Sequence, residues 1–164
     1  MLQRKAVLAF LLVAAASPAL AHGAPRGEAK ATVAGKAVSI DYGRPSLAGR
    51  DMLGKAEVGK AWRMGADAAT TLKTDADLTF GSSKVPKGSY VLTATRTSET
   101  EWALNVTKAE GDKDKSKVAD VSFVVGKLAE SVEEFTIELR GDKDKGEIEL
   151  QWGTTSLKAA FTGK

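Results

Sequence analysis

The feature that most constrains this chain is an alternation of apolar and polar side chains that returns along most of its length. The apolar residues occupy every second position in seven segments, namely 38–42, 90–94, 102–106, 121–125, 135–139, 148–152 and 157–161. Successive side chains of a strand point to opposite faces, so a period of two is typical of half-buried strands. A helix would scatter the same residues around its circumference. The alternation therefore predicts an all-β fold.

Turn signals rich in Gly, Pro and Ser separate these segments at intervals of roughly ten residues. They stand at 35–36, 81–83, 86–88, 141–146 and 153–154. Short strands at such spacing favour an antiparallel β-sandwich, jelly-roll-like or similar. We expect about nine or ten strands. A β-barrel is the alternative, and the sequence alone does not separate the two.

The N-terminus has the pattern of a secretory signal. Arg4 and Lys5 precede an apolar run over 6–16, and the small-x-small site Ala19-Leu20-Ala21 follows it. Eleven apolar residues are too few to span a bilayer as a helix. We therefore expect cleavage near Ala21 and export to the periplasm or beyond, with no transmembrane segment in the mature chain.

This interpretation divides the chain into three parts. Residues 1–21 are the expected signal peptide, 22–28 a flexible N-terminal tail and 29–164 a single sandwich domain. The whole chain carries 24 basic and 21 acidic side chains, for a net charge of +3. Two of the basic ones leave with the signal, so the exported domain is nearly neutral and has no field to attract nucleic acid.

Metal, cofactor and thiol chemistry find little support. The chain has no Cys and one His, His22, which cleavage would place at the new N-terminus. An α-amine beside an imidazole can chelate copper, but such sites need a further His. The repeated tips 111–115 and 141–145 contain Asp-Lys-Asp, yet both lack the Gly and Glu that an EF-hand loop requires. We expect no metal and no cofactor.

Residues 41–71 differ from the rest of the chain, because they show no clear periodicity. The segment contains five Gly together with Arg44, Arg50, Arg63 and Trp62. Long loops without secondary structure are usually functional or disordered. Its apolar residues favour one long ordered loop, which could be a lid, a core plug or an interface.

The three arginines of this segment are the candidate ligand-binding charges, since a guanidinium binds carboxylate or phosphate in bidentate fashion. The alternative is that they pair with Asp41, Asp51 or Asp67. Trp62 is either core or a platform for a ligand. The candidate ligand-binding residues are Tyr42, Arg44, Arg50, Trp62, Arg63, Asp67 and Tyr90. None is assigned a catalytic or metal-binding role.

Three stretches carry a resemblance to a known family. They are SIDYGRPSLAGR at 39–50, WRMGADAATT at 62–71 and VPKGSY at 85–90. Together they resemble the exported bacterial family called domain of unknown function 2911, whose pattern includes Tyr-x-Arg-Pro, Trp-Arg-x-Gly-Ala and Pro-x-Gly-x-Tyr. This chain has Asp67-Ala68 where that family usually has Asn-Glu, which argues against a shared catalytic carboxylate. The resemblance implies a domain and no activity.

These observations favour a non-catalytic binding module over an enzyme. The predicted ligand is a small anionic group or a carbohydrate, held by the Arg and aromatic residues of 41–71, and another envelope protein is a further possible partner. Two alternatives stay open. One is a glycosidase-like hydrolase built on carboxylates such as Asp41, Asp51, Glu57 and Asp67. The other is a purely structural envelope protein.

Overall fold

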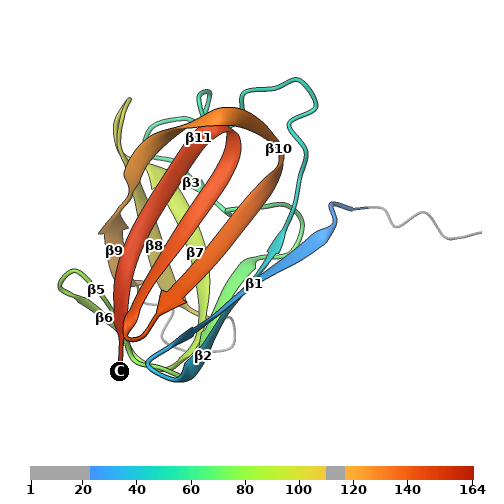
Figure 1. Cartoon of the computed structure of the whole chain (residues 1–164). Helices are drawn as coiled ribbons and strands as arrows, with labels where there is room; N and C mark the ends of the chain where they lie inside the picture. Colours follow the sequence, from blue (N-terminus) through green and yellow to red (C-terminus); the bar gives the residue numbers. More distant parts are fainter. Residues whose placement is uncertain (1–22, 110–116) are drawn as a thin grey trace, which may run out of the picture.

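A computed structural model describes residues 23–109 and 117–164 of the chain (Figure 1), and within them every regular element is a strand. The predicted signal peptide, His22 and the tip at 111–115 lie outside these residues. The strands are β1 (Arg26–Val33), β2 (Lys36–Gly43), β3 (Ala61–Trp62), β4 (Thr70–Thr74), β5 (Leu78–Phe80), β6 (Ser83–Val85), β7 (Gly88–Arg96), β8 (Trp102–Lys108), β9 (Lys117–Ser122), β10 (Val124–Asp142) and β11 (Lys145–Gly163).

The first sheet has the order β1-β2-β4-β7-β8-β9, and β3 pairs with the far end of β7. All of its pairs are antiparallel. The predicted alternation is visible in β7, where Tyr90, Leu92 and Ala94 are buried and the residues between them are half-exposed. Leu92 lies opposite Val106 of β8, so neighbouring strands turn the same face to the core.

The second sheet has the order β10-β11-β5-β6, and its two long strands bend over one end of the molecule (Figure 1). Residues 124–127 of β10 pair with 155–158 of β11, whereas residues 136–142 pair with 145–151. The register shifts between these two ladders, where the strands bend. The tip predicted at 141–145 is the turn that joins β10 to β11.

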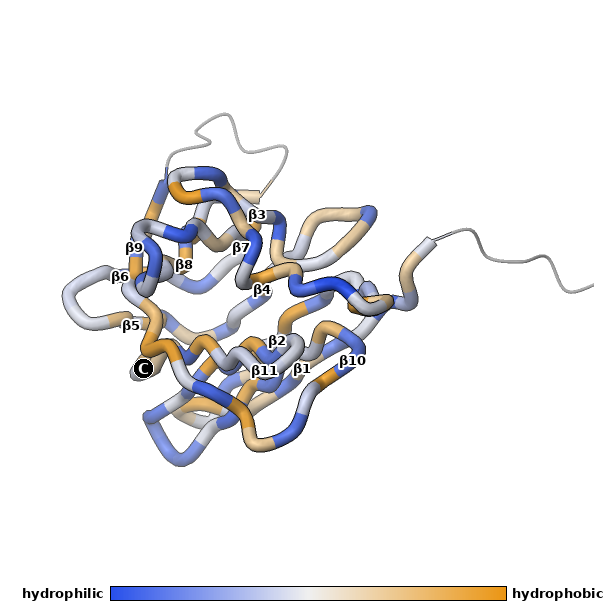
Figure 2. The backbone as a smooth tube through the Cα atoms, turned by 90° about the horizontal axis from the view of Figure 1, so that it is seen from above, coloured by the Kyte–Doolittle hydropathy of each residue, from blue (hydrophilic) through white to orange (hydrophobic). Residues whose placement is uncertain are grey.

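The two sheets pack as the layers of a sandwich, which confirms the predicted fold class. Viewed from above, β7, β8 and β9 lie on one side and β10 and β11 on the other (Figure 2). Among the described residues the strands form no closed barrel, so that alternative is wrong. The β1 edge of the first sheet lies against the second sheet. There the Ala34 N–H, in the turn after β1, donates to the Lys143 carbonyl, in the turn between β10 and β11, at 2.6 Å.

One boundary differs from the sequence prediction, because β1 begins at Arg26, inside the predicted tail of 22–28. Gly27 lies opposite Tyr42 in the β1–β2 ladder. A Cβ at Gly27 would stand 2.6 Å from Cδ of Arg44 and 2.9 Å from Cζ of Tyr42. The Gly that suggested a tail is therefore needed where two side chains cross the strand.

Residues from both sheets fill the core. Phe80 and Phe161 meet at a centroid distance of 5.1 Å, and a second aromatic group surrounds Phe135. Within the described part of the chain there is no helix long and apolar enough to cross a membrane.

Candidate functional site

The segment between β2 and β3 is an ordered loop, and its first half is fastened to β10. The Phe135 N–H donates to the Pro45 carbonyl at 2.9 Å, and the Leu47 N–H donates to the Glu133 carbonyl at 3.0 Å. Ser46 and Glu134 form an isolated antiparallel bridge between these bonds. The start of the loop thus joins the second sheet as a short extra pairing. In Figure 1 the loop passes over the same end of the molecule as the bend of β10.

The second half of the loop is fastened to the first sheet by Arg96, at the end of β7. Its Nη1 donates to the carbonyls of Gly54 and Ala56, both at 3.0 Å, and the Gly59 N–H donates to the Arg96 carbonyl at 2.8 Å. Arg96 Nη2 also binds the backbone carbonyl of Glu99 at 2.6 Å. A single side chain therefore fixes the course of the loop over the sheet.

Trp62 of β3 stands in an aromatic cluster drawn from both sheets. Its ring is stacked on Trp152 of β11, with 5.8 Å between centroids and 14° between planes. Phe135 meets it edge-on at 5.0 Å and Trp102 at 6.4 Å. Trp152 is held in turn, because its Nε1 donates to the Glu133 carbonyl at 3.2 Å. The cluster fixes the position of a half-buried indole at the end of the sandwich.

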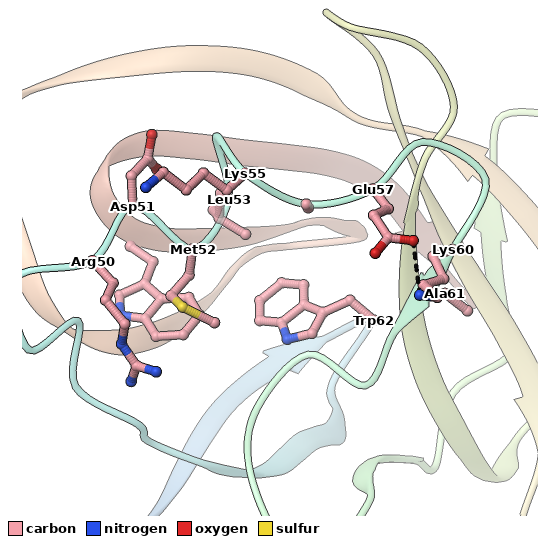
Figure 3. A pocket seen from close by; sticks show the side chains of 11 residues that line it. Arg50, Asp51, Met52, Leu53, Lys55, Glu57, Lys60, Ala61 and Trp62 are labelled. Carbon is pink, nitrogen blue, oxygen red and sulfur yellow. Dashed lines mark ion pairs between the residues drawn. The ribbon is translucent and has the colours of Figure 1, made fainter.

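A cleft of about 410 Å³ opens over this indole (Figure 3). Its lining is Arg50, Asp51, Met52, Leu53, Lys55, Ala56, Glu57, Lys60, Ala61, Trp62 and Trp152. Figure 3 shows Met52 and Leu53 on one side of the Trp62 ring and Ala61 on the other. The walls are therefore mainly apolar, and the long charged side chains belong to the loop around them.

The acidic groups of the cleft already have partners. Glu57 pairs with Lys60 at 2.7 Å, and the Asp51 carboxylate accepts the Gly54 N–H at 2.8 Å. Arg50 is exposed, and its Nε donates to the Leu47 carbonyl at 3.2 Å. Within residues 23–109 and 117–164 no ion pair involves Arg50 or Lys55. The cleft thus offers two cationic groups without carboxylate partners.

Of the seven residues predicted for a site, Arg50 and Trp62 line this cleft. Tyr42 is buried and its hydroxyl donates to the Ile137 carbonyl at 3.3 Å. Tyr90 is buried too, with its hydroxyl on the Pro86 carbonyl. Burial is the main cause that raises the pKa of Tyr90, which keeps its phenol protonated as a donor. Tyr42 thus links β2 to β10 of the other sheet, and Tyr90 fastens the turn that precedes its own strand.

Arg44 crosses to β10 and makes three contacts there. Its Nε donates to the Phe135 carbonyl at 3.3 Å, its Nη2 donates to Oγ1 of Thr136 at 3.2 Å, and Nη2 pairs with Glu134 at 3.2 Å. The partner is therefore none of the three aspartates considered from the sequence, because the strand beside Arg44 in space is 91 residues away in the chain.

Arg63 and Asp67 form a turn of their own beyond β3. Arg63 Nη1 donates to the Asp67 carbonyl at 2.7 Å, and the Asp67 carboxylate accepts the Ala24 N–H at 2.7 Å. Asp41, the remaining aspartate of the segment, pairs with Arg26. Arg63 is exposed but does not line the cleft. The three arginines consequently occupy three different surroundings.

Sequence reasoning missed Trp152, Met52 and Arg96 as parts of this region. Trp152 fits the strand alternation, so nothing in the sequence marks it as more than a sheet residue. Arg96 continues the buried positions 90, 92 and 94 with a charged side chain, and this break in the alternation is the signal that could have found it. Met52 is one of the apolar residues of 41–71 that favoured an ordered loop, and nothing in the sequence places it at a cleft. No group of three or more His, Cys, Asp or Glu residues that could hold a metal ion occurs in the described ranges.

Fold and cleft together define the class of this protein: an antiparallel β-sandwich with an anchored loop and an aromatic-floored cleft at one end. The chain matches the model of the family described as "Protein of unknown function (DUF2911)" over residues 24–161 and belongs to that family. The expected family is thereby confirmed. No curated protein and no solved structure matched the chain.

Proposed function

We propose that this protein is an exported, non-catalytic binding module whose ligand, a small anionic compound or a glycan, occupies the cleft over Trp62. The observation that carries the proposal is the half-buried Trp62 ring at the base of a cleft of about 410 Å³. Small-molecule sites are commonly concave, mostly apolar and of this size, with a few polar groups that set orientation. Aromatic rings can bind the flat face of a sugar or another ring by stacking.

The support of the cleft also favours binding, because contacts within the protein hold its parts in place. The Trp62 ring contacts three other aromatic rings, and the loop opposite it is bonded to both sheets. A site fixed before binding loses less conformational entropy when the ligand arrives.

The carboxylates give the hydrolase alternative no comparable support. Asp51 and Glu57 are the two acidic groups at the cleft, and each is already engaged, by the Gly54 N–H and by Lys60. Asp41 is paired with Arg26, and the Asp67 carboxylate accepts the Ala24 N–H. Glycoside hydrolysis uses two carboxylates that act on the bound sugar, whereas Asp51 and Glu57 are both bonded to neighbours in their own loop.

A cleft-filling substitution tests the binding proposal. Ala61 is exposed in β3 and lines the cleft, so A61F adds a ring to the cleft without overfilling the core. We expect it to abolish calorimetrically measured binding of whichever acidic or neutral oligosaccharide, or small carboxylate, the wild type binds. The matched control is A160F, at an exposed position of β11 outside the cleft, which should leave binding unchanged. Binding that survives A61F, or no binding by the wild type in such a screen, would contradict the proposal.

The export part of the proposal rests on the sequence of the first 21 residues. Expression of the full chain in a bacterium, followed by intact-mass measurement of the periplasmic fraction, tests it. We expect a mature product that begins at His22. A full-length protein retained in the cytoplasm would overturn it.

A further inference from the structure

From the charges and walls of the cleft we infer its ligand class: an amphipathic anion, with a flat apolar body over Trp62 and an acidic head group at Arg50. This inference rests on the proposed function and narrows it. The inferred ligand class contains neither neutral sugars nor cations.

The apolar body follows from the walls. Met52, Leu53 and Ala61 surround the Trp62 ring, and the thioether of a methionine adapts to ligands of irregular outline. Sugar hydroxyls placed against such walls would lose hydrogen bonds to water without replacing them, which costs free energy. An aromatic or alicyclic ring loses no such bonds and gains contact area.

The acidic head group follows from the charges. Of the two negative side chains of the cleft, Glu57 is paired with Lys60 at 2.7 Å, whereas the Asp51 carboxylate keeps its charge and accepts the Gly54 N–H at 2.8 Å. Three basic side chains against these two acidic ones leave the lining with a net positive charge. Arg50 donates from Nε to the Leu47 carbonyl, and its η nitrogens make no hydrogen bond to any other residue within 23–109 and 117–164. Figure 3 shows the guanidinium of Arg50 on the side of Met52 and pointing away from Lys55, whose side chain extends toward Asp51.

The geometry of Arg50 suits a carboxylate or sulfonate. With Nε bonded to Leu47, the guanidinium is oriented while its outer edge stays open to solvent. Charge-assisted bonds from such a fork are the strong ones in proteins, and the paired geometry selects planar acidic groups.

A matched series of naphthalene compounds tests the inference by calorimetry with the full mature protein. The probes are 2-naphthoate, the neutral 2-naphthylmethanol and the cationic 2-naphthylmethylammonium, with maltotriose as the glycan. We expect naphthoate to bind about tenfold tighter than the alcohol, since one or two charge-assisted bonds separate them, and the amine to bind weakest. The preference should shrink as salt rises, because these charges are exposed.

The variant R50Q identifies the head-group contact. We expect the affinity for naphthoate to fall to within about twofold of that for the alcohol, while affinity for the alcohol is unchanged. The matched control is R63Q. Arg63 is also exposed and also bonded to one backbone carbonyl, at 2.7 Å, but it lies outside the cleft. R63Q should behave as the wild type.

The outcomes separate this inference from the proposed function. Equal binding of naphthoate and alcohol, or a preference kept in R50Q, overturns the inference. Binding of maltotriose that A61F abolishes, with no binding of naphthoate, overturns the inference but supports the binding module. No binding of any probe overturns the inference and counts against the proposed function as well.

Discussion

Two regions of this molecule display arginine at the surface, and they differ in what surrounds it. On the outer face of β10 and β11, Arg140 contacts three carboxylates: Glu138, Glu147 at 3.0 Å and Glu149 at 2.7 Å. At the cleft, Arg50 has only a backbone carbonyl and stands beside an apolar hollow.

The buried member of the first region shows why its charges are structural. The Glu149 side chain is 5% exposed, and Lys158 approaches it at 3.6 Å in addition to Arg140. Burial alone would raise the pKa of Glu149, but hydrogen bonds from Arg140, Gln151 and Ser156, together with the charge of Lys158, outweigh it and lower the pKa. A carboxylate so well surrounded holds strands together and has no capacity left for a ligand.

The contrast teaches how to read arginine in a small sheet protein. A guanidinium with its carboxylates in place contributes to stability, whereas one oriented by a single carbonyl next to an aromatic hollow is available to a ligand. The same contrast exists inside the loop, where Arg44 is bound to β10 at three points and Arg50 is not.

The largest expected effect comes from the core beneath the cleft. Phe135 is fully buried and touches Tyr42, Trp62 and Trp152. We expect F135A to lower the free energy of unfolding by about 3–5 kcal/mol, because a large cavity is left in a packed cluster. Urea unfolding followed by tryptophan fluorescence measures the loss. The control V125A, at a side chain 43% exposed on the same strand, should change it by less than about 0.5 kcal/mol. Similar losses of unfolding free energy in both variants would show that the aromatic cluster under the cleft is not part of the stabilising core.

An intermediate loss of stability is expected when the buried carboxylate of Glu149 is removed, and a smaller one when the exposed carboxylate of Glu57 is removed. E149Q removes the buried carboxylate that Arg140 and Lys158 contact, and we expect a loss of about 1–2 kcal/mol because the arginine is itself half-exposed. E57Q, which breaks the exposed pair with Lys60 at the cleft, should cost less than about 0.5 kcal/mol. Unfolding midpoints in urea for the two variants and the wild type measure the difference. Equal midpoints for E149Q and E57Q would show that the ion pairs of Glu149 stabilise the fold no more than the exposed pair of Glu57 and Lys60 does.

The sequence predicted most of the strands but not how they are arranged. Alternation predicts strands wherever one face is buried, so β2, β7 and the second half of β10 were foreseen. Alternation also predicted β8, although residues 102–106 are buried on both faces. The turn signal at 153–154 predicted a break between two strands, whereas Gly153 pairs with Val132 at the bend of a single continuous strand, β11. The matching bend of β10 was not predicted. Sheet order depends on contacts far apart in the chain, which periodicity does not report.

The candidate site was predictable only on the loop side. Gly, Arg and Trp in an aperiodic stretch pointed to Arg50 and Trp62, and both line the cleft. The opposite side depends on Trp152, which reads as an ordinary strand residue, and on the backbone carbonyl of Glu133, whose side-chain identity carries no signal for that role. Arg44 looked equivalent to Arg50 because its partners on β10 are 91 and 92 residues away.

The smallest expected effect is the loss of stability at acidic pH that comes from protonation of Glu149. Because the pKa of Glu149 is lowered by folding, its ionised form contributes stability that is complete above the unfolded pKa of about 4.3 and is lost as pH falls through the folded value. The free energy of unfolding of the wild type should therefore decline below that pH, and the decline should be shallower in E149Q, which has no carboxylate to protonate there. Urea unfolding at several pH values between 7 and 3 measures both curves. Parallel curves would mean that the outer-face network does not favour the ionised carboxylate, and the contrast between Arg140 and Arg50 would then rest on geometry alone.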